Sequence, residues 1–533
     1  MAVDLLIRDA LIVDGTGAAP FHGHVAVDGE KIVGVGELTD AGASRVIDAS
    51  GRIVCPGFVD PHSHSDFTIL TNPTAESTIR QGVTTEVVGN CGLTYAPVSA
   101  LSSPLIAGRL RTFAYHGPVE WESFADYMSL LSQIGHSQNL AWFVGHNTIR
   151  WAAGVFEPQA TEEQLRTMER YVAEAMLAGA LGLSTGLEFN PGRAAPTNEI
   201  VRLNRVVGRY EGYYASHVRN RDAHLQESID EFLTILRGGG TRGQISHLNV
   251  RNRTGAAPGA WERAVDTMAR AREEGLDVLA DTTPFRDGLG QMAGILPPWV
   301  LADGWQYACD RLRDPRVRES LRGECDRYWR FIHRGEWDRV RLQASPGYPG
   351  LDGKDFNEIA ALLGRDQWDC YFDILADAGP GIESIMLIGE LFTDEHLAEM
   401  ISHPLFCLGV DGYTAALGGD LEGVAGHPVC FAGHVHYLTH HVGEAHTLPI
   451  EEAIRKMTSM PARHFGLSDR GELRPGMAAD LVVLDLERLD DGSTLEQPLA
   501  YARGIDEVFV NGVAVVSGNE HTGARPGRHL ARA

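Results

Sequence analysis

The sequence predicts an α/β fold, a (β/α) barrel with insertions, joined to a small β-sandwich built from both ends of the chain. Three observations predict it. Strand-like and helical patterns alternate through the middle, period-two strands with Asp-Gly turns occupy both ends, and nearly every central strand ends in a residue that can bind a metal or move a proton. A doubly wound sheet is the alternative, but no G-x-G-x-x-G follows a strand.

Both ends of the chain have a sequence pattern typical of β-strands. Residues 1–55 contain "DLLIRDALIVDG" and "HVAVDGEKIVGVG", and residues 470–533 contain "ADLVVLDLE" and "IDEVFVNGVAVVSG". Apolar residues alternate with polar ones in these runs, as in half-buried strands. We therefore expect the ends to pair into one small domain that brackets a barrel over residues 56–469.

The middle of the chain repeats a helix-then-strand order. "TEEQLRTMERYVAEAMLAGA" leads into "LGLSTGL", "DAHLQESIDEFLTILRGGG" into "GQISHLNV", and "GAWERAVDTMARAREEG" into "LDVLAD". In the first of these, Thr161 and Gln164 have the spacing of a helix-capping box. Residues 285–350, which carry Trp299, Trp305, Tyr328 and Trp329, are expected to form an insertion that caps the barrel mouth.

Composition excludes several classes of function. The formal net charge of −25 makes nucleic acid and anionic membranes unsuitable partners. The chain has seven cysteines, an odd number, and no CxxC, as expected in a reducing compartment. It shows no signal peptide and no apolar run of about 18 residues. We predict a cytoplasmic protein with a small-molecule substrate, and the oligomeric state, including a homo-oligomer, stays open.

The strand ends carry the chemistry. His62 and His64 follow "IVCPGFVD" and point to the same face of an extended segment, since side chains alternate with period two. In parallel barrels the catalytic residues sit at the carboxyl ends of the strands. Core packing gives no reason for such residues to recur there. The residues at or near the other strand ends are Cys91, His146, Ser184, Glu188, His217, His247, Asp281 and Asp411.

Five of the strand-end residues are candidate ligands for one or two divalent metal ions. Imidazole and carboxylate ligands favour zinc. A single histidine in this set could equally be a hydrogen-bonded, half-buried side chain, but five in strand-end order favour a metal site. The five residues are His62, His64, His217, His247 and Asp411.

Several motifs resemble the amidohydrolase superfamily, and within it the D-aminoacylase (N-acyl-D-amino-acid deacylase) branch. They are "PGFVDPHSHSD", "TTEVVGNCG", "FVGHNTIR", "STGLEFNPG", "SHVRN", "ISHLN", "GVDG" and "TSMPARHFGLSDRGELRPGMAADLVVLD". The resemblance covers nearly the whole chain. It implies a distorted (β/α)8 barrel, a β-sandwich made from both termini, and zinc-dependent hydrolysis of a carbon–nitrogen bond.

Many binuclear members of the superfamily bridge two metals with a carboxylated lysine, which this chain cannot supply. Its lysines, Lys31, Lys354 and Lys456, all lie outside the window between His64 and His217. Cys91 is the best substitute, because a thiolate binds zinc well and similar enzymes of the branch use a cysteine here. Glu188 is the alternative bridging ligand.

We expect one tight zinc site and a second, weaker position. Cys91, His217 and His247 would hold the tight zinc, and His62, His64 and Asp411 the weaker one, with Cys91 between them. Whether both are filled stays open.

The expected reaction is hydrolysis of a linear amide by metal-activated water. Asp411 is the expected catalytic residue, which would take the proton of the water and pass it to the leaving nitrogen. One alternative is a hydrolase of cyclic amides such as lactams, hydantoins or imides, but these usually carry the carboxylated lysine. Another is a non-catalytic amidohydrolase-like scaffold, which the retained ligand set disfavours.

The substrate pocket departs from the branch at three positions. Asn249 stands where similar sequences have lysine, Thr283 where they have tyrosine, and Val429 where they have arginine. In the family these positions help hold the substrate carboxylate or shape its pocket, so their replacement predicts a deacylase-like enzyme with a divergent substrate pocket. Guanidinium groups suit carboxylates and could substitute for the lost groups. The candidate substrate-binding residues are His146, Ser184, Asn249, Thr283, Arg219, Arg251 and Arg286.

Overall fold

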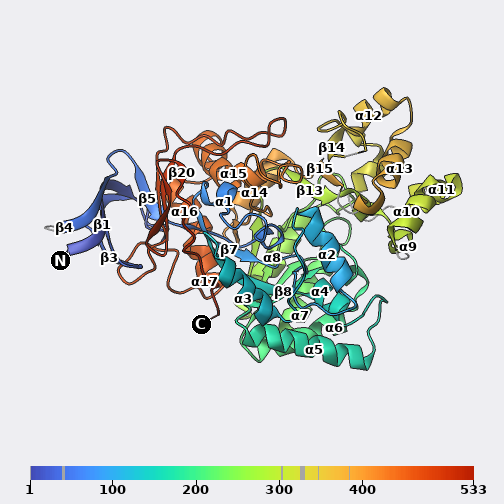
Figure 1. Ribbon diagram of the computed structural model, residues 1–533, viewed down its shortest axis with the longest axis horizontal. Helices are drawn as coiled ribbons and strands as arrows, with labels where there is room; N and C mark the ends of the chain where they lie inside the picture. Colours follow the sequence, from blue (N-terminus) through green and yellow to red (C-terminus); the bar gives the residue numbers. More distant parts are fainter. Residues whose placement is uncertain are drawn as a thin grey trace.

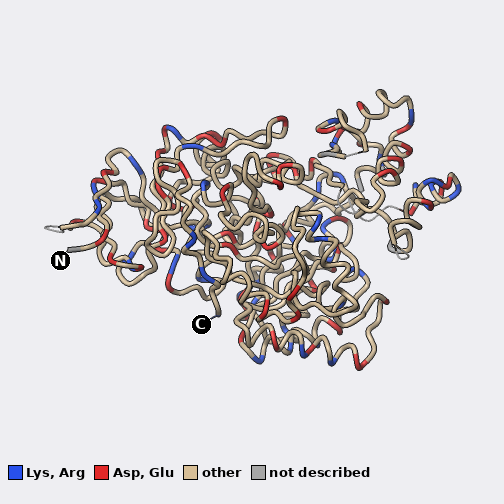
Figure 2. Tube along the Cα trace, in the orientation of Figure 1, with Lys and Arg blue, Asp and Glu red and all other residues tan. Residues whose placement is uncertain are grey.

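The computed structural model describes residues 2–38, 42–301, 304–324, 330–345, 347–382 and 385–532. Strands from both ends of the chain lie side by side in one sheet, next to a barrel and a projecting lobe (Figure 1). Within these residues, no helix has both the length and the apolar character needed to cross a bilayer. Acidic and basic residues are interspersed over the part of the chain that is described (Figure 2).

The two ends of the chain share a nine-stranded sheet, in the order β20-β19-β18-β17-β5-β1-β2-β3 with β4 paired to β1. The ends are joined where β5 pairs antiparallel with β17, with Cys55 opposite Val482. Side chains from both ends, among them Ile7, Val25 and Val483, form a common apolar core. The strands are β1 (Ala2–Ile12), β2 (Phe21–Asp28), β3 (Lys31–Gly36), β4 (Gly42–Asp48), β5 (Ile53–Pro56), β17 (Leu481–Leu484), β18 (Ile505–Val510), β19 (Val513–Ser517) and β20 (Glu520–His521).

The barrel expected from the sequence is confirmed. Eight strands form one sheet in the order β16-β12-β11-β10-β9-β8-β7-β6, and their pairing is parallel. A parallel bridge between Ser63 and Gly412, just beyond β6 and β16, nearly closes it. The strands are β6 (Phe58–Asp60), β7 (Val83–Val88), β8 (Asn139–Gly145), β9 (Gly182–Gly186), β10 (Tyr213–His217), β11 (Arg242–Ile245), β12 (Val278–Thr282) and β16 (Phe406–Leu408).

Helices alternate with the barrel strands along the chain (Figure 1). In α5 (Glu162–Leu177), Thr161 and Gln164 form the expected capping box. The other helices of this part are α1 (Glu76–Ile79), α2 (Ser103–Thr112), α3 (Phe124–Ile134), α4 (His146–Ala152), α6 (Thr197–Gly208), α7 (Leu225–Gly239), α8 (Ala260–Glu273), α14 (Asp394–Ser402), α15 (Val429–His436), α16 (Ile450–Met457) and α17 (Ser459–His464).

The apolar run "IVCPGFVD" is not one strand. Its first half, β5, belongs to the nine-stranded sheet, and its second half, β6, begins the barrel. The break falls at Gly57, where a Cβ atom would come within 2.2 Å of Thr84 Oγ1. Only glycine allows the chain to pass so close to β7 as it changes sheets.

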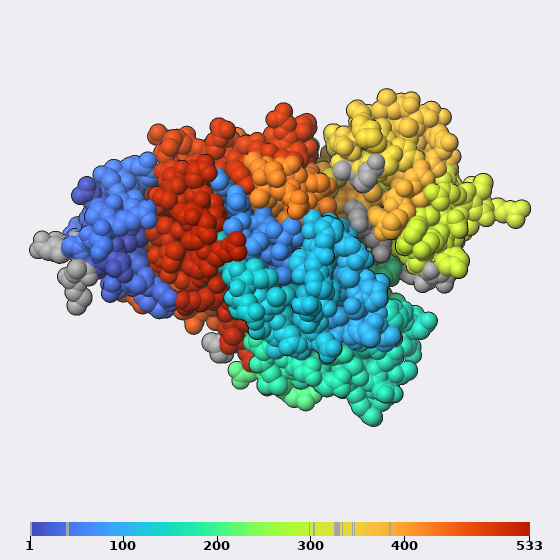
Figure 3. All heavy atoms as spheres, in the orientation of Figure 1, coloured from blue at the N-terminus to red at the C-terminus, as the bar shows by residue number. Residues whose placement is uncertain are grey.

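The chain between β12 and α14 forms a separate lobe that projects from one side of the molecule (Figure 3). Its three-stranded sheet needs β15, so the lobe extends beyond the expected limit at residue 350. Trp299 and Trp305 are each 40% exposed, whereas Tyr328 and Trp329 lie outside the described residues. The lobe consists of β13 (Asp287–Gln291), β14 (Val340–Ala344), β15 (Met386–Glu390), α9 (Pro298–Leu301), α10 (Trp305–Arg313), α11 (Pro315–Glu324), α12 (Phe356–Leu363) and α13 (Gln367–Asp377).

Candidate metal centre

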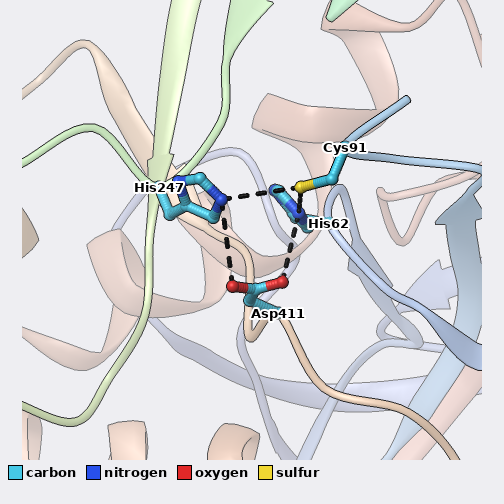
Figure 4. A group of neighbouring side chains, drawn as sticks. All are labelled: His62, Cys91, His247 and Asp411. Carbon is cyan, nitrogen blue, oxygen red and sulfur yellow. Dashed lines mark hydrogen bonds and ion pairs between the residues drawn. The ribbon is translucent and has the colours of Figure 1, made fainter. Parts of the chain in front are cut away.

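Side chains from five barrel strands meet at the carboxyl end of the barrel. His62, Cys91, His247 and Asp411 each offer one ligand atom, and these atoms all lie within 4.8 Å of one another. Figure 4 shows the four side chains turned toward a common point. They come from the segments that follow β6, β7, β11 and β16, and His217, the last residue of β10, joins them. The barrel therefore gathers residues that are up to 349 positions apart in the sequence.

The Cys91 thiol lies among three imidazoles. Its Sγ is 3.5 Å from His62 Nε2, 3.8 Å from His217 Nδ1 and 3.6 Å from His247 Nε2. Asp411 lies on the other side of the histidines. Its Oδ1 is 3.3 Å from His62 Nε2 and 3.1 Å from His64 Nε2, and its Oδ2 is 3.9 Å from His247 Nε2. The six residues expected to bind metal thus form one cluster.

Three residues of the cluster have a strained backbone. Cys91, His247 and Asp411 have φ values of 52°, 35° and 56°, in the left-handed region that disfavours side chains with a Cβ atom. Each such residue costs about 1–3 kcal/mol, and such strain concentrates at functional sites. At these three positions the backbone turns sharply after a strand, which directs the side chain inward.

Two buried carboxylates orient the imidazole rings. Asp281 Oδ1 lies 3.1 Å from His62 Nδ1 and also accepts a 2.7 Å hydrogen bond from the amide of His247. Glu188 Oε2 lies 2.6 Å from His217 Nε2. A carboxylate thus holds the outer nitrogen of the His62 and His217 rings, and the inner nitrogen of each faces Cys91, the usual arrangement behind metal-binding histidines.

The charges of the cluster favour ionised ligands. Burial disfavours the Cys91 thiolate, but the adjacent His62 charge and contacts with His217 and His247 hold the pKa of the thiol well below its usual value. Burial also opposes ionisation of Asp411, yet His62 and His247 hold the pKa of this carboxyl well below its usual range. A thiolate and a carboxylate are the forms in which these groups bind metal.

One side of the cluster is open. The His62, His217 and His247 side chains are at most 6% exposed, whereas His64 is 12% and Asp411 32% exposed. Solvent therefore reaches the cluster chiefly at His64 and Asp411.

The chain matches the amidohydrolase family over residues 45–516. The chain belongs to the amidohydrolase family. It is 32% identical to the N-acyl-D-glutamate deacylase of Alcaligenes xylosoxydans xylosoxydans, across 99% of this chain and 97% of that protein, and 30% identical to the D-aminoacylase of the same organism, across 99% and 98%.

Solved structures agree with this membership. An N-acyl-D-glutamate deacylase from Bordetella bronchiseptica, complexed with zinc and a phosphonate inhibitor that mimics the tetrahedral intermediate of the reaction, aligns over 100% of both chains with a TM-score of 0.81 and 29% identity. A D-hydantoinase from Thermus sp. aligns over 99% of both chains at 15% identity with a TM-score of 0.55, a likeness of fold alone.

Among the remaining residues expected at the site of this amidohydrolase, Ser184 and Asn249 bond to the segments that carry Cys91 and His247, whereas the side chains of His146 and Thr283 bond to residues outside the cluster. Ser184 holds the loop that carries Cys91, because its Oγ donates to Gly89 O at 2.5 Å and accepts from Gly92 N at 3.1 Å. Asn249 Nδ2 donates to His247 O at 2.6 Å. His146 is fully buried against Glu199, with its Nε2 2.8 Å from Oε1. Thr283 Oγ1 donates to Phe285 O at 3.2 Å.

The three arginines proposed as anion binders are all engaged by carboxylates. Arg219 pairs with Glu231 at 2.9 Å. Arg251 is buried between Glu188 and Asp222, and Arg286 lies 3.7–3.8 Å from three carboxylates. Glu188 is on the outer side of His217, the side away from Cys91.

Two contributors to the site, Asp281 and Arg221, were given no role in it from the sequence. Asp281 follows the strand-end pattern, so its position was a usable signal. Arg221 Nη1 lies 2.8 Å from His247 Nδ1 and its Nη2 3.2 Å from Glu188 Oε2, contacts that no spacing in the sequence indicates. Lys456 donates to the carbonyl of Phe406 at the start of β16, so this lysine lies at the opposite end of that strand from the cluster.

Proposed function

We propose that this amidohydrolase removes the acyl group from N-acyl-D-amino acids with zinc bound in the cluster. The observation that carries the proposal is the Cys91 thiol among three imidazoles, where no lysine can serve as a bridge. Thiolate sulfur, imidazole nitrogen and carboxylate oxygen form a donor set that fits zinc. The N-acyl-D-glutamate, N-acyl-D-aspartate and general D-aminoacylase relatives support a D-amino-acid substrate.

In this proposal Cys91, His217 and His247 hold a tightly bound zinc ion. His62, His64 and Asp411 offer a second, weaker position, with Cys91 between the two. Glu188 orients His217 from behind, which supports Cys91 over Glu188 as the bridging ligand. Zinc, when bound, would supply Lewis-acid activation of water and of the scissile carbonyl.

Asp411 is the proposed general base and acid. It is the most exposed member of the cluster, so both water and substrate can reach its carboxylate. Its backbone amide donates to His62 O at 2.9 Å, which fixes the carboxylate at the open side. A carboxylate there can take the proton of the attacking water and deliver it to the leaving nitrogen.

Metal content and turnover test the proposal together. Wild type, Cys91→Ala and Cys55→Ala would be compared by elemental analysis and by hydrolysis of N-acetyl-D-amino acids, N-acetyl-L-amino acids and a hydantoin. Cys55 is the matched control, because it is a buried thiol on β5 in the other sheet. We expect one or two zinc ions per chain in wild type and Cys55→Ala, loss of zinc in Cys91→Ala, and turnover of the D-substrates only. Full zinc in Cys91→Ala would refute the thiolate ligand, and hydrolysis of the hydantoin alone would favour the cyclic-amide alternative.

We also propose that the protein is cytoplasmic. The six cysteines that the structure describes are free and buried, which suits a reducing compartment. Fractionation of the source cells would test the location. Self-association stays a prediction that sedimentation would test.

A further inference from the structure

A row of aromatic rings, here called the aromatic wall, begins at His64, one of the two most exposed residues of the cluster. The His64 ring stacks on Phe67 with 4.8 Å between centroids and an interplanar angle of 19°. Phe67 contacts Phe113 at 5.2 Å, and Phe113 contacts Tyr413 at 5.5 Å. Because Tyr413 lies two residues beyond Asp411, the wall runs beside both of the exposed ligands. The aromatic wall therefore adjoins the side of the cluster that solvent can reach.

Arg109 places a positive charge on this wall. It belongs to α2, and its guanidinium carbon lies 5.5 Å from the centroid of the Phe67 ring. Arg109 is half-buried, and its guanidinium has no ion pair and no hydrogen bond with any of the described residues. Burial raises the pKa of the Asp66 carboxyl, and the nearby Arg109 charge opposes this rise, but the two groups do not reach ion-pair distance. A half-buried guanidinium without a carboxylate partner beside a binding site is prepared to receive an anion.

Four other arginines, by contrast, lie close to carboxylates. Arg221 and Arg251 contact Glu188 on the outer side of His217. The remaining pairs are Arg219 with Glu231, and Arg286 with Asp287, Glu390 and Asp394.

We propose that Arg109 binds a carboxylate at the far end of the substrate, and so selects N-acyl amino acids that carry a second acidic group. This inference rests on the proposed function. The α-carboxylate is two bonds from the scissile nitrogen, whereas Arg109 is linked to His64 through Phe67, whose ring centroid lies 4.8 Å from that of His64 and 5.5 Å from the Arg109 guanidinium carbon. A carboxylate four bonds from the nitrogen, as in a glutamate side chain, suits that separation. A dicarboxylic acyl group offers the same chemistry from the other side of the amide.

Paired substrates that differ only in the distal group test the proposal. N-acetyl-D-glutamate would be compared with N-acetyl-D-glutamine, and N-succinyl-D-alanine with N-succinamoyl-D-alanine, in wild type, Arg109→Gln and Arg111→Gln. Arg111 is the matched control, because it is an exposed arginine on the same helix. We expect Arg109→Gln to lower kcat/KM for one of the two acids by about 10- to 100-fold, as for a lost charged hydrogen bond, and to change its amide partner less than about twofold. The acid that responds identifies the source of the carboxylate.

Other outcomes are decisive in different ways. Equal losses on acid and amide in Arg109→Gln, or no loss on either acid, would overturn the inference while the deacylase function stands. A wild type that turns over none of the four compounds, nor any neutral N-acyl-D-amino acid, would refute the proposed function and the inference with it. Zinc content and thermal unfolding of each variant separate a binding effect from misfolding, and Arg109→Lys should retain part of the preference for the acid.

Discussion

At the residue scale, the cluster depends on backbone conformations that its residues disfavour. Cys91, His247 and Asp411 all have positive φ values, and each keeps a side chain that glycine would lack. The fold around them holds this strain, since Ser184 bonds to both sides of the Cys91 loop and Asp281 holds the His247 amide. These conformations therefore lower the stability of the fold, but they direct the three ligand side chains into the cluster.

This strain can be measured at Cys91. In metal-free protein, we expect Cys91→Gly to be more stable than Cys91→Ala by about 1 kcal/mol, because glycine adopts a φ of 52° without a Cβ clash. Cys55 is the control, since it is a buried strand residue outside the left-handed region. There the order should reverse, with Cys55→Gly the less stable. Denaturant unfolding measures all four variants, and the same order at both positions would contradict the strain at Cys91.

At the element scale, a single glycine divides an apolar run between two sheets. Residues 53–56 continue the nine-stranded sheet and residues 58–60 start the barrel, and Gly57 passes against Thr84 on β7. The continuous apolar pattern of residues 53–60 predicts a single strand, because nothing in it distinguishes the first half from the second. The division follows from which neighbours each half meets, β17 for the first and β7 for the second.

Adding one carbon at this break should be costly. We expect Gly57→Ala to lower the free energy of unfolding by about 1–3 kcal/mol, because the new Cβ would meet three side-chain atoms of Thr84 within 2.8 Å. Gly323→Ala is the control, since nothing lies within 4 Å of a Cβ built there, on the exposed face of α11. Alanine should leave stability unchanged or raise it at that helical position. Equal effects of the two substitutions would exclude the steric reason.

At the scale of the whole molecule, the cluster lies at the seam of the barrel. His62 and His64 follow the first strand and Asp411 follows the last, and two backbone hydrogen bonds, Asp411 N to His62 O and His64 N to Gly412 O, join the segments. A ligand that binds both sides of a seam stabilises the closed barrel relative to an open one. The nine-stranded sheet carries none of the cluster residues.

Removal of the metal should therefore loosen the barrel unevenly. After chelation, we expect a lower thermal midpoint, together with faster amide hydrogen exchange at residues 62–64 and 410–412. Exchange in β5 and β17, which pair in the other sheet, should change little, so these strands serve as the internal control. Faster exchange throughout the chain would instead indicate that the metal stabilises the whole fold rather than the seam.

The sequence by itself determined the class of fold and the residues of the cluster. Period-two ends, helix-then-strand repeats and donors at strand ends are local patterns, and local patterns survive in a single sequence. The domain division at 55 and 469 stays a prediction of the same kind. Only the tertiary structure decided which donors face one another, and that Glu188 and Asp281 lie behind the histidines. It alone showed which arginines lie close to carboxylates. Those that do include Arg219, Arg251 and Arg286, whereas Arg109 does not. The physical reason is that ion pairing and side-chain direction depend on distances across the barrel, which no spacing along the chain encodes.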